Sequence, residues 1–251
     1  MDPRKIFGNK TLNFAHRGFT ERAVENTLSA FQAALELGVD GIELDVRTCK
    51  TGEVVVIHDP TVTRLTNGRG FVKSKTLSEL KALRIKGVDG EFDEQIPTLA
   101  EVLDLVGEKT ILNVEIKTKG LPKDHIEQKV VDVLRAYALE YKSIISSFNP
   151  LVLRRIKKID EKIMSGYLID KNFNVRNSEI SLSKLAGARA IHLEWRLATE
   201  NLIQKIKDSG YYLMVWSVNE PKMMQRYLQL GVHGIITDRS DLLNEYLRGE
   251  R

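Results

Sequence analysis

The sequence has almost no cysteine and no long apolar segment. Its single cysteine, Cys49, excludes an internal disulfide, is compatible with a reducing compartment, and has no nearby cysteine or histidine that would suggest a zinc site. No apolar run approaches the roughly 20 residues that a membrane-spanning helix needs. The first residues, MDPRKIFGNK, lack the apolar centre of a signal peptide. We therefore expect a cytoplasmic protein without stable membrane insertion.

The sequence also lacks a basic tract and a glycine-rich phosphate-binding turn. Charged residues make up 29% of the chain and the net charge is +4, which is an ordinary balance for a soluble protein. Without a basic tract, nucleic acid is not an expected partner, although the modest positive charge could attract an anionic small molecule. Without the glycine-rich turn, an open doubly wound sheet is disfavoured.

Apolar segments with strand character alternate with amphipathic helices along most of the chain. Such alternation implies helical crossover connections and a parallel sheet. Eight strand–helix units in 251 residues predict a closed TIM (β/α)8 barrel. The expected strands are 12–15, the strand that begins at Gly41, 111–117, 143–148, 163–169, 190–195, 211–218 and 234–237.

One region, from Pro60 to Pro97, interrupts this alternation. Glycines punctuate it, and its one clear helix, near Leu77 to Leu83, follows a capping box made by Thr76 and Glu79. We therefore expect a single catalytic domain, residues 1–251, with a small insertion at about 60–97 after the second strand. Because the insertion leaves the end of the hairpin described next, it should cover the C-terminal face of the barrel as a small cap.

The stretch GIELDVRTCKTGEVVVIHDP, from Gly41 to Pro60, carries the first candidate site residues. Glu43 and Asp45 occupy alternate positions of an apolar strand, so they share one face. The turn centred on Thr51-Gly52 predicts a tight hairpin that returns His58 close to these acids. A hairpin with solvated acids on its outer face is the alternative for this stretch taken alone.

Further chemically active residues fall at the C-terminal ends of other expected strands, where the active site of such a barrel lies. Glu115 and Lys117 lie at the end of one strand. If they did not belong to the active site, they would form only a structural ion pair. With Glu43 and Asp45, Glu115 makes an all-oxygen set, which favours Mg²⁺ or Ca²⁺ over zinc and also suits Mn²⁺.

The charges of these groups indicate the class of substrate. Three carboxylates and a divalent cation leave one negative charge, which Arg17 and Lys117 turn into one positive charge, so a phosphodiester would neutralise the pocket. His16 and His58 offer an acid and a base near neutral pH for breaking a P–O bond. On a regular strand, however, Arg17 faces away from His16, so both reach the pocket only if the strand has already ended.

Other residues at strand ends have simpler explanations. Asp238 suits a helix cap or a loop hydrogen bond, and Trp216 alone suits packing. His192 and Glu194 lie on the same face of their strand. His192 could therefore line the pocket or be packed inside the barrel, and the sequence favours neither.

Taken together, the motifs resemble the glycerophosphodiester phosphodiesterase family over nearly the whole chain. The matching motifs are His16-Arg17-Gly18, Glu25-Asn26-Thr27, Glu43-Leu44-Asp45-Val46, His58-Asp59, Glu115-Ile116-Lys117, Ser147-Phe148 and Val215-Trp216-Ser217-Val218-Asn219. This resemblance implies a TIM-barrel enzyme that hydrolyses glycerophosphodiesters to sn-glycerol 3-phosphate and an alcohol.

The resemblance also implies roles for individual residues. Glu43, Asp45 and Glu115 would bind the metal ion, His16 and His58 would be the catalytic acid and base, and Arg17 and Lys117 would hold the phosphate. We add Trp216 to the substrate-binding candidates. The sequence does not assign the two histidines. The position of His58, beside the insertion that should help to choose the alcohol, favours His58 as the acid.

Three other activities remain open at this point. A lysophospholipase D and a cyclising phosphodiester lyase could use the same barrel, but an acyl chain would call for an amphipathic membrane-binding face, and we find none. A non-catalytic phosphoester-binding protein is less favoured, because it would require the loss of a histidine or an acid. The small soluble glycerophosphodiester is therefore the expected substrate.

Overall fold

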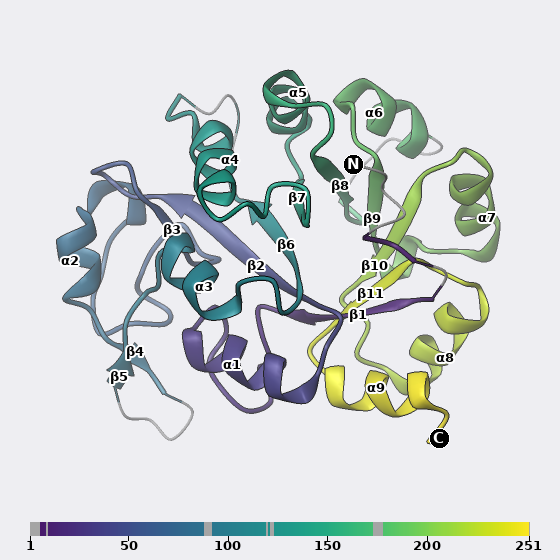
Figure 1. Cartoon of the computed structure of the whole chain (residues 1–251), viewed down its shortest axis with the longest axis horizontal. Coiled ribbons are helices and arrows are strands. Elements are labelled where there is room, and N and C mark those ends of the chain that lie inside the picture. The colour runs from purple at the N-terminus through teal and green to yellow at the C-terminus, as the bar shows by residue number, and fades with distance from the viewer. Residues whose placement is uncertain are drawn as a thin grey trace.

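The computed structural model describes residues 6–8, 10–87, 92–118, 120, 123–172 and 178–250. Within them, eight parallel strands form a closed barrel, because the first strand pairs with both the second and the last. The expected TIM (β/α)8 fold is thus confirmed (Figure 1). The barrel strands are β1 (Leu12–His16), β2 (Gly41–Thr48), β6 (Ile111–Ile116), β7 (Ser143–Ser147), β8 (Met164–Ile169), β9 (Ala190–Glu194), β10 (Tyr212–Trp216) and β11 (Gly234–Thr237).

Helices connect these strands and surround the barrel. Threonine side chains cap several of them as expected: Thr27 accepts a hydrogen bond from Ala30 N, and Thr98 and Glu101 form a capping box. The helix α4 (Ile126–Ala136) ends two residues before Ala138, whose φ of 57° is not helical. The helices are α1 (Leu28–Leu37), α3 (Leu99–Val106), α4 (Ile126–Ala136), α5 (Pro150–Ile159), α6 (Glu179–Ala186), α7 (Glu200–Asp208), α8 (Pro221–Gln229) and α9 (Ser240–Arg248), with a 3₁₀ turn at Trp195–Leu197. Among the described residues, no helix has the length and apolarity needed to cross a membrane.

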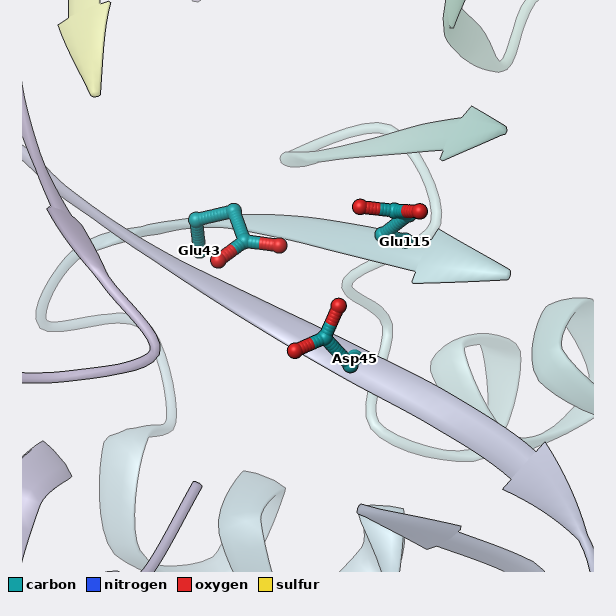
Figure 2. A group of neighbouring side chains, drawn as sticks. All are labelled: Glu43, Asp45 and Glu115. Carbon is teal, nitrogen blue, oxygen red and sulfur yellow. The ribbon is translucent and has the colours of Figure 1, made fainter. Parts of the chain in front are cut away.

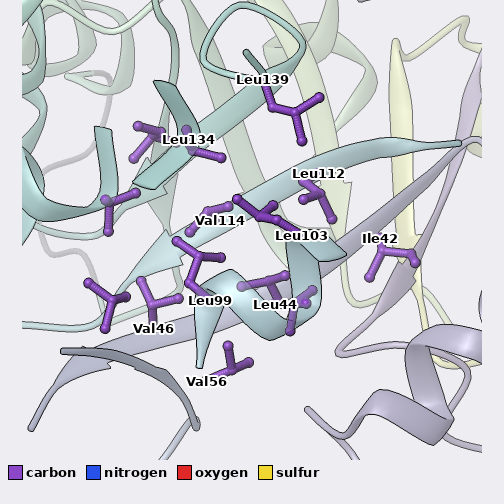
Figure 3. Close-up of a cluster of buried hydrophobic side chains, with 14 of the residues drawn as sticks. Ile42, Leu44, Val46, Val56, Leu99, Leu103, Leu112, Val114, Leu134 and Leu139 are labelled. Atoms are coloured by element: carbon purple, nitrogen blue, oxygen red, sulfur yellow. The ribbon is translucent and has the colours of Figure 1, made fainter. Parts of the chain in front are cut away.

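The hydrophobic core lies mainly between the strands and the helices. On β2 the outward positions Ile42, Leu44 and Val46 are fully buried against neighbouring strands and α3 (Figure 3). Strand alternation then turns Glu43 and Asp45, which lie between these residues, toward the barrel interior. The apolar side of β2 therefore fixes which way its two acids point.

Apolar side chains fill the N-terminal half of the barrel interior. Phe14, Ile144 and Met214 belong to one buried cluster there. Gly41 is required beside Phe14, because a Cβ at position 41 would lie 2.2 Å from Phe14 Cε1. The barrel is closed at this end, so the polar groups of its interior gather at the C-terminal end.

The predicted hairpin is present, with a loop longer than a tight turn. β3 (Val54–Val56) runs antiparallel to β2, and Thr48 faces Val54, so Cys49–Glu53 form the connection. Gly52, at its centre, has a φ of 104°. The hairpin returns His58 to the mouth of the barrel, where it lines the same cavity as Glu43.

The described residues between 60 and 97 do not form the expected cap over the barrel mouth. Its short elements, the 3₁₀ helix Val72–Ser74, α2 (Leu77–Lys81), β4 (Ile85–Lys86) and β5 (Phe92–Glu94), lie to one side beyond β3 (Figure 1). Val62, Val72 and Leu80 pack on Val55 and Ile57, the outer face of the hairpin. None of its described residues lines the two cavities at the barrel mouth. The cap expectation was wrong because these apolar side chains are buried against the hairpin instead.

Replacing Gly41 by alanine tests the close packing of the barrel interior. We expect Gly41→Ala to reduce the free energy of unfolding by about 1–3 kcal/mol, because the new methyl group would collide with the buried Phe14 ring. Urea denaturation of the two proteins measures the difference. Gly8→Ala is the matched control, since a Cβ there meets no atom within 4 Å. Equal losses for the two variants would contradict this account.

Candidate active site

The first site residues lie where β1 ends. His16 is the last residue of β1, and Arg17 has a left-handed φ of 58°, so the strand has ended before Arg17. The condition for both side chains to reach one pocket is thereby met. Arg17 Nε lies 3.1 Å from Asp45 Oδ2, and its backbone N–H donates to Glu43 Oε2 at 3.1 Å. The backbone turn at position 17 thus brings a guanidinium onto the acids of β2.

Three buried carboxylates converge at the barrel mouth. Glu43 and Asp45 come from β2, and the β2–β6 register pairs Asp45 with Glu115. One oxygen of each lies within 4.8 Å of the others, and Figure 2 shows the carboxyl groups pointing toward one another. Asn26 holds Asp45 in place through reciprocal hydrogen bonds, donating from Nδ2 to Asp45 Oδ2 and accepting from Asp45 N.

The pKa shifts show how strongly these charges interact. Burial, with the neighbouring charge of Asp45, raises the pKa of Glu43 to about 8. Burial would also raise the pKa of Asp45, but the charges of Lys117 and Arg17 outweigh it and lower that pKa to about 2. Burial and then Asp45 raise the pKa of Glu115, although Lys117 opposes them.

This arrangement fits a divalent cation. Burial, and then the repulsion of neighbouring carboxylates, make Glu43 favour its protonated form near neutral pH. An ion bound among them would remove that repulsion, and an all-oxygen donor set suits a hard cation. The described residues therefore form a buried acidic cluster with the chemistry of a divalent metal site.

Each of the two histidines has a carboxylate at its Nδ1 atom. His16 Nδ1 lies 2.7 Å from Asp238 Oδ1, and His58 Nδ1 lies 2.8 Å from Asp59 Oδ1. Burial opposes protonation of His16, but Asp238 and Glu43 outweigh it and raise its pKa. Burial lowers the pKa of His58, and Asp45 and Asp59 offset that effect only in part. Because a carboxylate accepts from each Nδ1–H, the Nε2 atoms remain to exchange a proton with a ligand, and Nε2 of His16 lies 3.9 Å from Glu43 Oε2.

A cavity of about 240 Å³ joins these groups. His16, Arg17, His58 and Lys117 all line it, and Lys117 Nζ lies 2.6 Å from Glu115 Oε1 and 3.1 Å from Asp45 Oδ1. A second cavity, of about 370 Å³, shares His16 and Arg17 with the first and extends toward Glu25. Arg17, one of the two phosphate-binding candidates, therefore stands where the two cavities meet, and Lys117 lines the smaller one.

One wall of the smaller cavity is apolar. Trp216 and Phe148 both line it, and their rings pack edge to face with centroids 5.6 Å apart. Trp216 Nε1 donates to His192 O at 2.9 Å, which fixes the indole, and Lys117 Nζ lies 5.7 Å from the centre of the Phe148 ring. Trp216 thus combines packing with a position on the pocket wall.

His192 does not join the site. It is fully buried, packs against Gly166, and lines neither cavity at the barrel mouth. Neither of its ring nitrogens has a hydrogen-bond partner among the described residues, and burial lowers its pKa to about 3. It is a neutral imidazole that fills the barrel.

Several residues of the site were not identified from the sequence. Asp238, expected to serve as a cap or loop residue, orients His16, and Asn219 donates to its other carboxylate oxygen. The repeat of Leu37–Ile42 in Leu230–Ile235, each followed three residues later by an aspartate, is a signal that could have revealed Asp238. Arg47 donates to the backbone oxygens of His58 and Lys117, and Arg64 binds Glu25 and Asp59. No pattern in the sequence pointed to these two arginines.

Comparison with known proteins gives one consistent result. The model of the glycerophosphoryl diester phosphodiesterase family matches residues 16–242. A glycerophosphodiester phosphodiesterase of Caldanaerobacter subterraneus subsp. tengcongensis is 41% identical over 95% of this chain and 98% of its own length. A glycerophosphodiester phosphodiesterase of Bacillus altitudinis is 34% identical over 91% of this chain and 94% of its own.

Solved structures agree with these relatives. A glycerophosphodiester phosphodiesterase from Thermotoga maritima is 30% identical, with a TM-score of 0.76 over 94% of this chain and 98% of its own. An Oleispira antarctica phosphodiesterase in complex with the product sn-glycerol-3-phosphate has a TM-score of 0.88 over 97% of this chain and 99% of its own. At 24% identity, this second similarity concerns the fold.

The raised pKa of Glu43 predicts how stability depends on pH without a cation. A carboxyl group with a raised folded-state pKa stabilises the protein fully below its ordinary pKa, and that contribution is lost as pH rises through the folded-state value. In chelator, we therefore expect the free energy of unfolding to fall between about pH 4.5 and pH 8. Urea denaturation across this range measures the slope, which Glu43→Gln should reduce.

Glu194 provides the control for this experiment. It is another buried strand-end carboxylate, but its pKa is lowered, because hydrogen bonds from Lys171 N and Arg196 outweigh the effect of burial. Glu194→Gln should therefore leave the slope between pH 4.5 and pH 8 unchanged. A slope that persists in Glu43→Gln would contradict the assignment to Glu43.

Proposed function

We propose roles for the residues of this pocket from the premise that the chain belongs to the glycerophosphoryl diester phosphodiesterase family. The reaction is the hydrolysis of a glycerophosphodiester to sn-glycerol 3-phosphate and an alcohol. The observation that supports our assignment most directly is that Glu43, Glu115, two cationic side chains and two carboxylate-paired histidines line one cavity. Asp45, the third carboxylate, lies within 4.8 Å of Glu43 and Glu115.

Glu43, Asp45 and Glu115 would hold the divalent cation. Their oxygen ligands favour Mg²⁺ or Ca²⁺, with Mn²⁺ as a further candidate. When bound, the cation would supply positive charge for the oxygens of the phosphodiester. Asn26 and the backbone N–H of Arg17 support two of the ligands by hydrogen bonding to Asp45 and Glu43.

Arg17 and Lys117 would bind and orient the phosphate. Both line the cavity, and both already lie beside the acids, so the phosphate would be held next to the cation. Because Arg17 stands where the two cavities meet, a diester could place one of its alcohols in each cavity. Trp216 and Phe148 would contact the carbon atoms of the alcohol that lies in the smaller cavity.

His16 and His58 would transfer the protons. In-line displacement puts the attacking oxygen and the leaving oxygen on opposite sides of phosphorus, so the two imidazoles would flank one phosphate. One accepts a proton from the attacking oxygen, and the other donates a proton to the departing alkoxide. Asp238 and Asp59 would keep each Nε2 atom directed at the phosphate.

The preferred substrate would be a small glycerophosphodiester, such as glycerophosphocholine or glycerophosphoethanolamine. The cavities, of about 240 and 370 Å³, are of a size that suits such a compound. A lysophospholipase D would in addition need room for an acyl chain. We also propose that residues 1–251 form one catalytic domain that acts in the cytoplasm, in keeping with the single buried cysteine, Cys49.

A substrate panel combined with removal of the cation tests this function. We expect hydrolysis of glycerophosphocholine or glycerophosphoethanolamine, little hydrolysis of lysophosphatidylcholine, and loss of activity in chelator that Mg²⁺, Ca²⁺ or Mn²⁺ restores. Glu115→Gln should weaken cation binding and activity together, by about 10-fold or more, and calorimetric titration measures the binding. Glu194→Gln is the matched control. Full activity in excess chelator would contradict the role of the cation.

The two histidines can be assigned by changing the leaving group. Choline needs a proton when it departs, whereas p-nitrophenolate scarcely does. If His58 is the acid, as its place at the end of the hairpin suggested, His58→Ala should lower kcat on glycerophosphocholine by about 10²–10⁴-fold and far less on a p-nitrophenyl diester. His16→Ala should damage both reactions alike.

The pKa directions make this experiment decisive. Without a cation, the pKa of His16 is raised and that of His58 is lowered, which is the order expected if His16 were the proton donor. The reverse pattern, with His16→Ala sparing the nitrophenyl substrate, would overturn the assignment of His58. Equal losses for both variants on both substrates would remove the case for separate roles.

A further inference from the structure

One side chain from outside the barrel connects the carboxylates that contact Arg17 and His58. Arg64 lies in the region from 60 to 97, and its Nε donates to Asp59 Oδ2 at 2.6 Å. Its Nη1 and Nη2 atoms donate to the two carboxylate oxygens of Glu25 at 3.0 and 2.7 Å. The guanidinium therefore makes three hydrogen bonds to two carboxylates that are 34 positions apart in the sequence.

Each of these carboxylates holds a residue of the pocket. Glu25 Oε1 accepts from Arg17 Nη1 at 2.9 Å, and Asp59 Oδ1 lies 2.8 Å from His58 Nδ1. Charges of opposite sign thus alternate from Arg17 through Glu25 and Arg64 to Asp59, and Asp59 in turn binds the His58 imidazole. At one end is a proposed phosphate ligand, and at the other is a proposed proton-transfer group.

The fold of this region explains why Arg64 stands at that place. Val62, two residues before it, is fully buried against the outer face of the hairpin, and the backbone N–H of Thr66, two residues after it, donates to Val62 O. Val62 N also donates to Gly70 O. Arg64 is thus presented from an anchored turn, although its own side chain is 46% exposed.

From this geometry we propose that Arg64 is a positioning residue that sets Arg17 and His58 at the correct separation for one phosphate. The inference rests on the roles proposed above for Arg17 and His58. Without Arg64, Asp59 can turn toward solvent and release the His58 imidazole, and Glu25 can release the Arg17 guanidinium. The described part of the region from 60 to 97 then contributes to catalysis through Arg64, without covering the pocket.

Exposure of Arg64 separates this role from a purely structural one. An exposed ion pair contributes little to stability, so removal of Arg64 should change the melting temperature only slightly. Misplacing a reacting group, in contrast, costs a large factor in rate. The proposal therefore predicts a large loss of activity in a protein that is almost as stable as the wild type.

The test compares Arg64→Ala and Arg64→Lys with Arg69→Ala. We expect both Arg64 variants to lower kcat/KM for glycerophosphocholine by about 10- to 100-fold, because lysine cannot make three hydrogen bonds in a planar fork. Arg69 is exposed in the same region and has no hydrogen bond or ion pair within the described part of the chain, so Arg69→Ala should match the wild type. Thermal unfolding of every variant gives its stability.

Two further variants resolve the branches of the series. Asp59→Asn should lower mainly kcat, through His58, and Glu25→Gln should raise mainly KM, through Arg17. In a His58→Ala background, Arg64→Ala should cause no further loss of kcat, because residues that act through one another are not additive. Wild-type kinetics in Arg64→Ala would overturn the proposal. A loss of kcat in the double variant that equals the sum of the two single losses, as free energies, would also overturn it.

The outcome for the single variants separates this inference from its premise. If Arg17→Ala and His58→Ala both retain activity, the proposed roles of those two residues are wrong. If both lose activity while Arg64→Ala and Arg64→Lys retain it, only the inference about Arg64 is wrong. If Arg64→Lys kept wild-type activity while Arg64→Ala lost it, the inference about Arg64 would also be contradicted. A single ammonium charge would then be enough to position Arg17 and His58.

Discussion

The repulsion among Glu43, Asp45 and Glu115 is the constraint on which the rest of the site depends. Their oxygens lie within 4.8 Å of one another in a buried place, where charge is poorly screened. Such a cluster needs compensating positive charge, which neighbouring cationic side chains supply and to which a bound divalent cation would add. Arg17 and Lys117 both contact Asp45, which explains why Asp45 stays ionised. Burial, and then the charge of Asp45, raise the pKa of Glu43.

The barrel creates this cluster through its register. Strand alternation turns Glu43 and Asp45 inward, and the parallel pairing of β2 with β6 places Glu115 directly beside Asp45. Apolar residues fill the N-terminal half of the interior, so the polar side chains collect at the other end. The same apolar packing that stabilises the barrel thus decides where its charged groups can be.

Around this cluster, most of the groups that could act on a phosphate have a partner that orients them. Asp238 and Asp59 bind the two imidazoles, and Arg47 holds the backbone of the His58 hairpin end. Arg64 joins Asp59 to Glu25 from a region that packs beside the hairpin. An insertion can therefore matter to a site that it does not cover, because one long side chain can reach the outer ring of hydrogen bonds.

The sequence by itself determined the fold class and the kinds of side chain that form the site. Alternating apolar segments specify strands and helices locally, and the position of an acid within a strand specifies the face that it shares with its neighbours. The tertiary structure alone decided four features of the site. These are the pairing of Asp238 with His16, the neutral state of the buried His192, the position of the described residues between 60 and 97, and the contacts of Arg64 with Glu25 and Asp59. Each of these depends on contacts between segments distant in the chain, which local residue patterns do not specify. The repeat of Leu37–Ile42 in Leu230–Ile235 marked the position of Asp238 but not its partner.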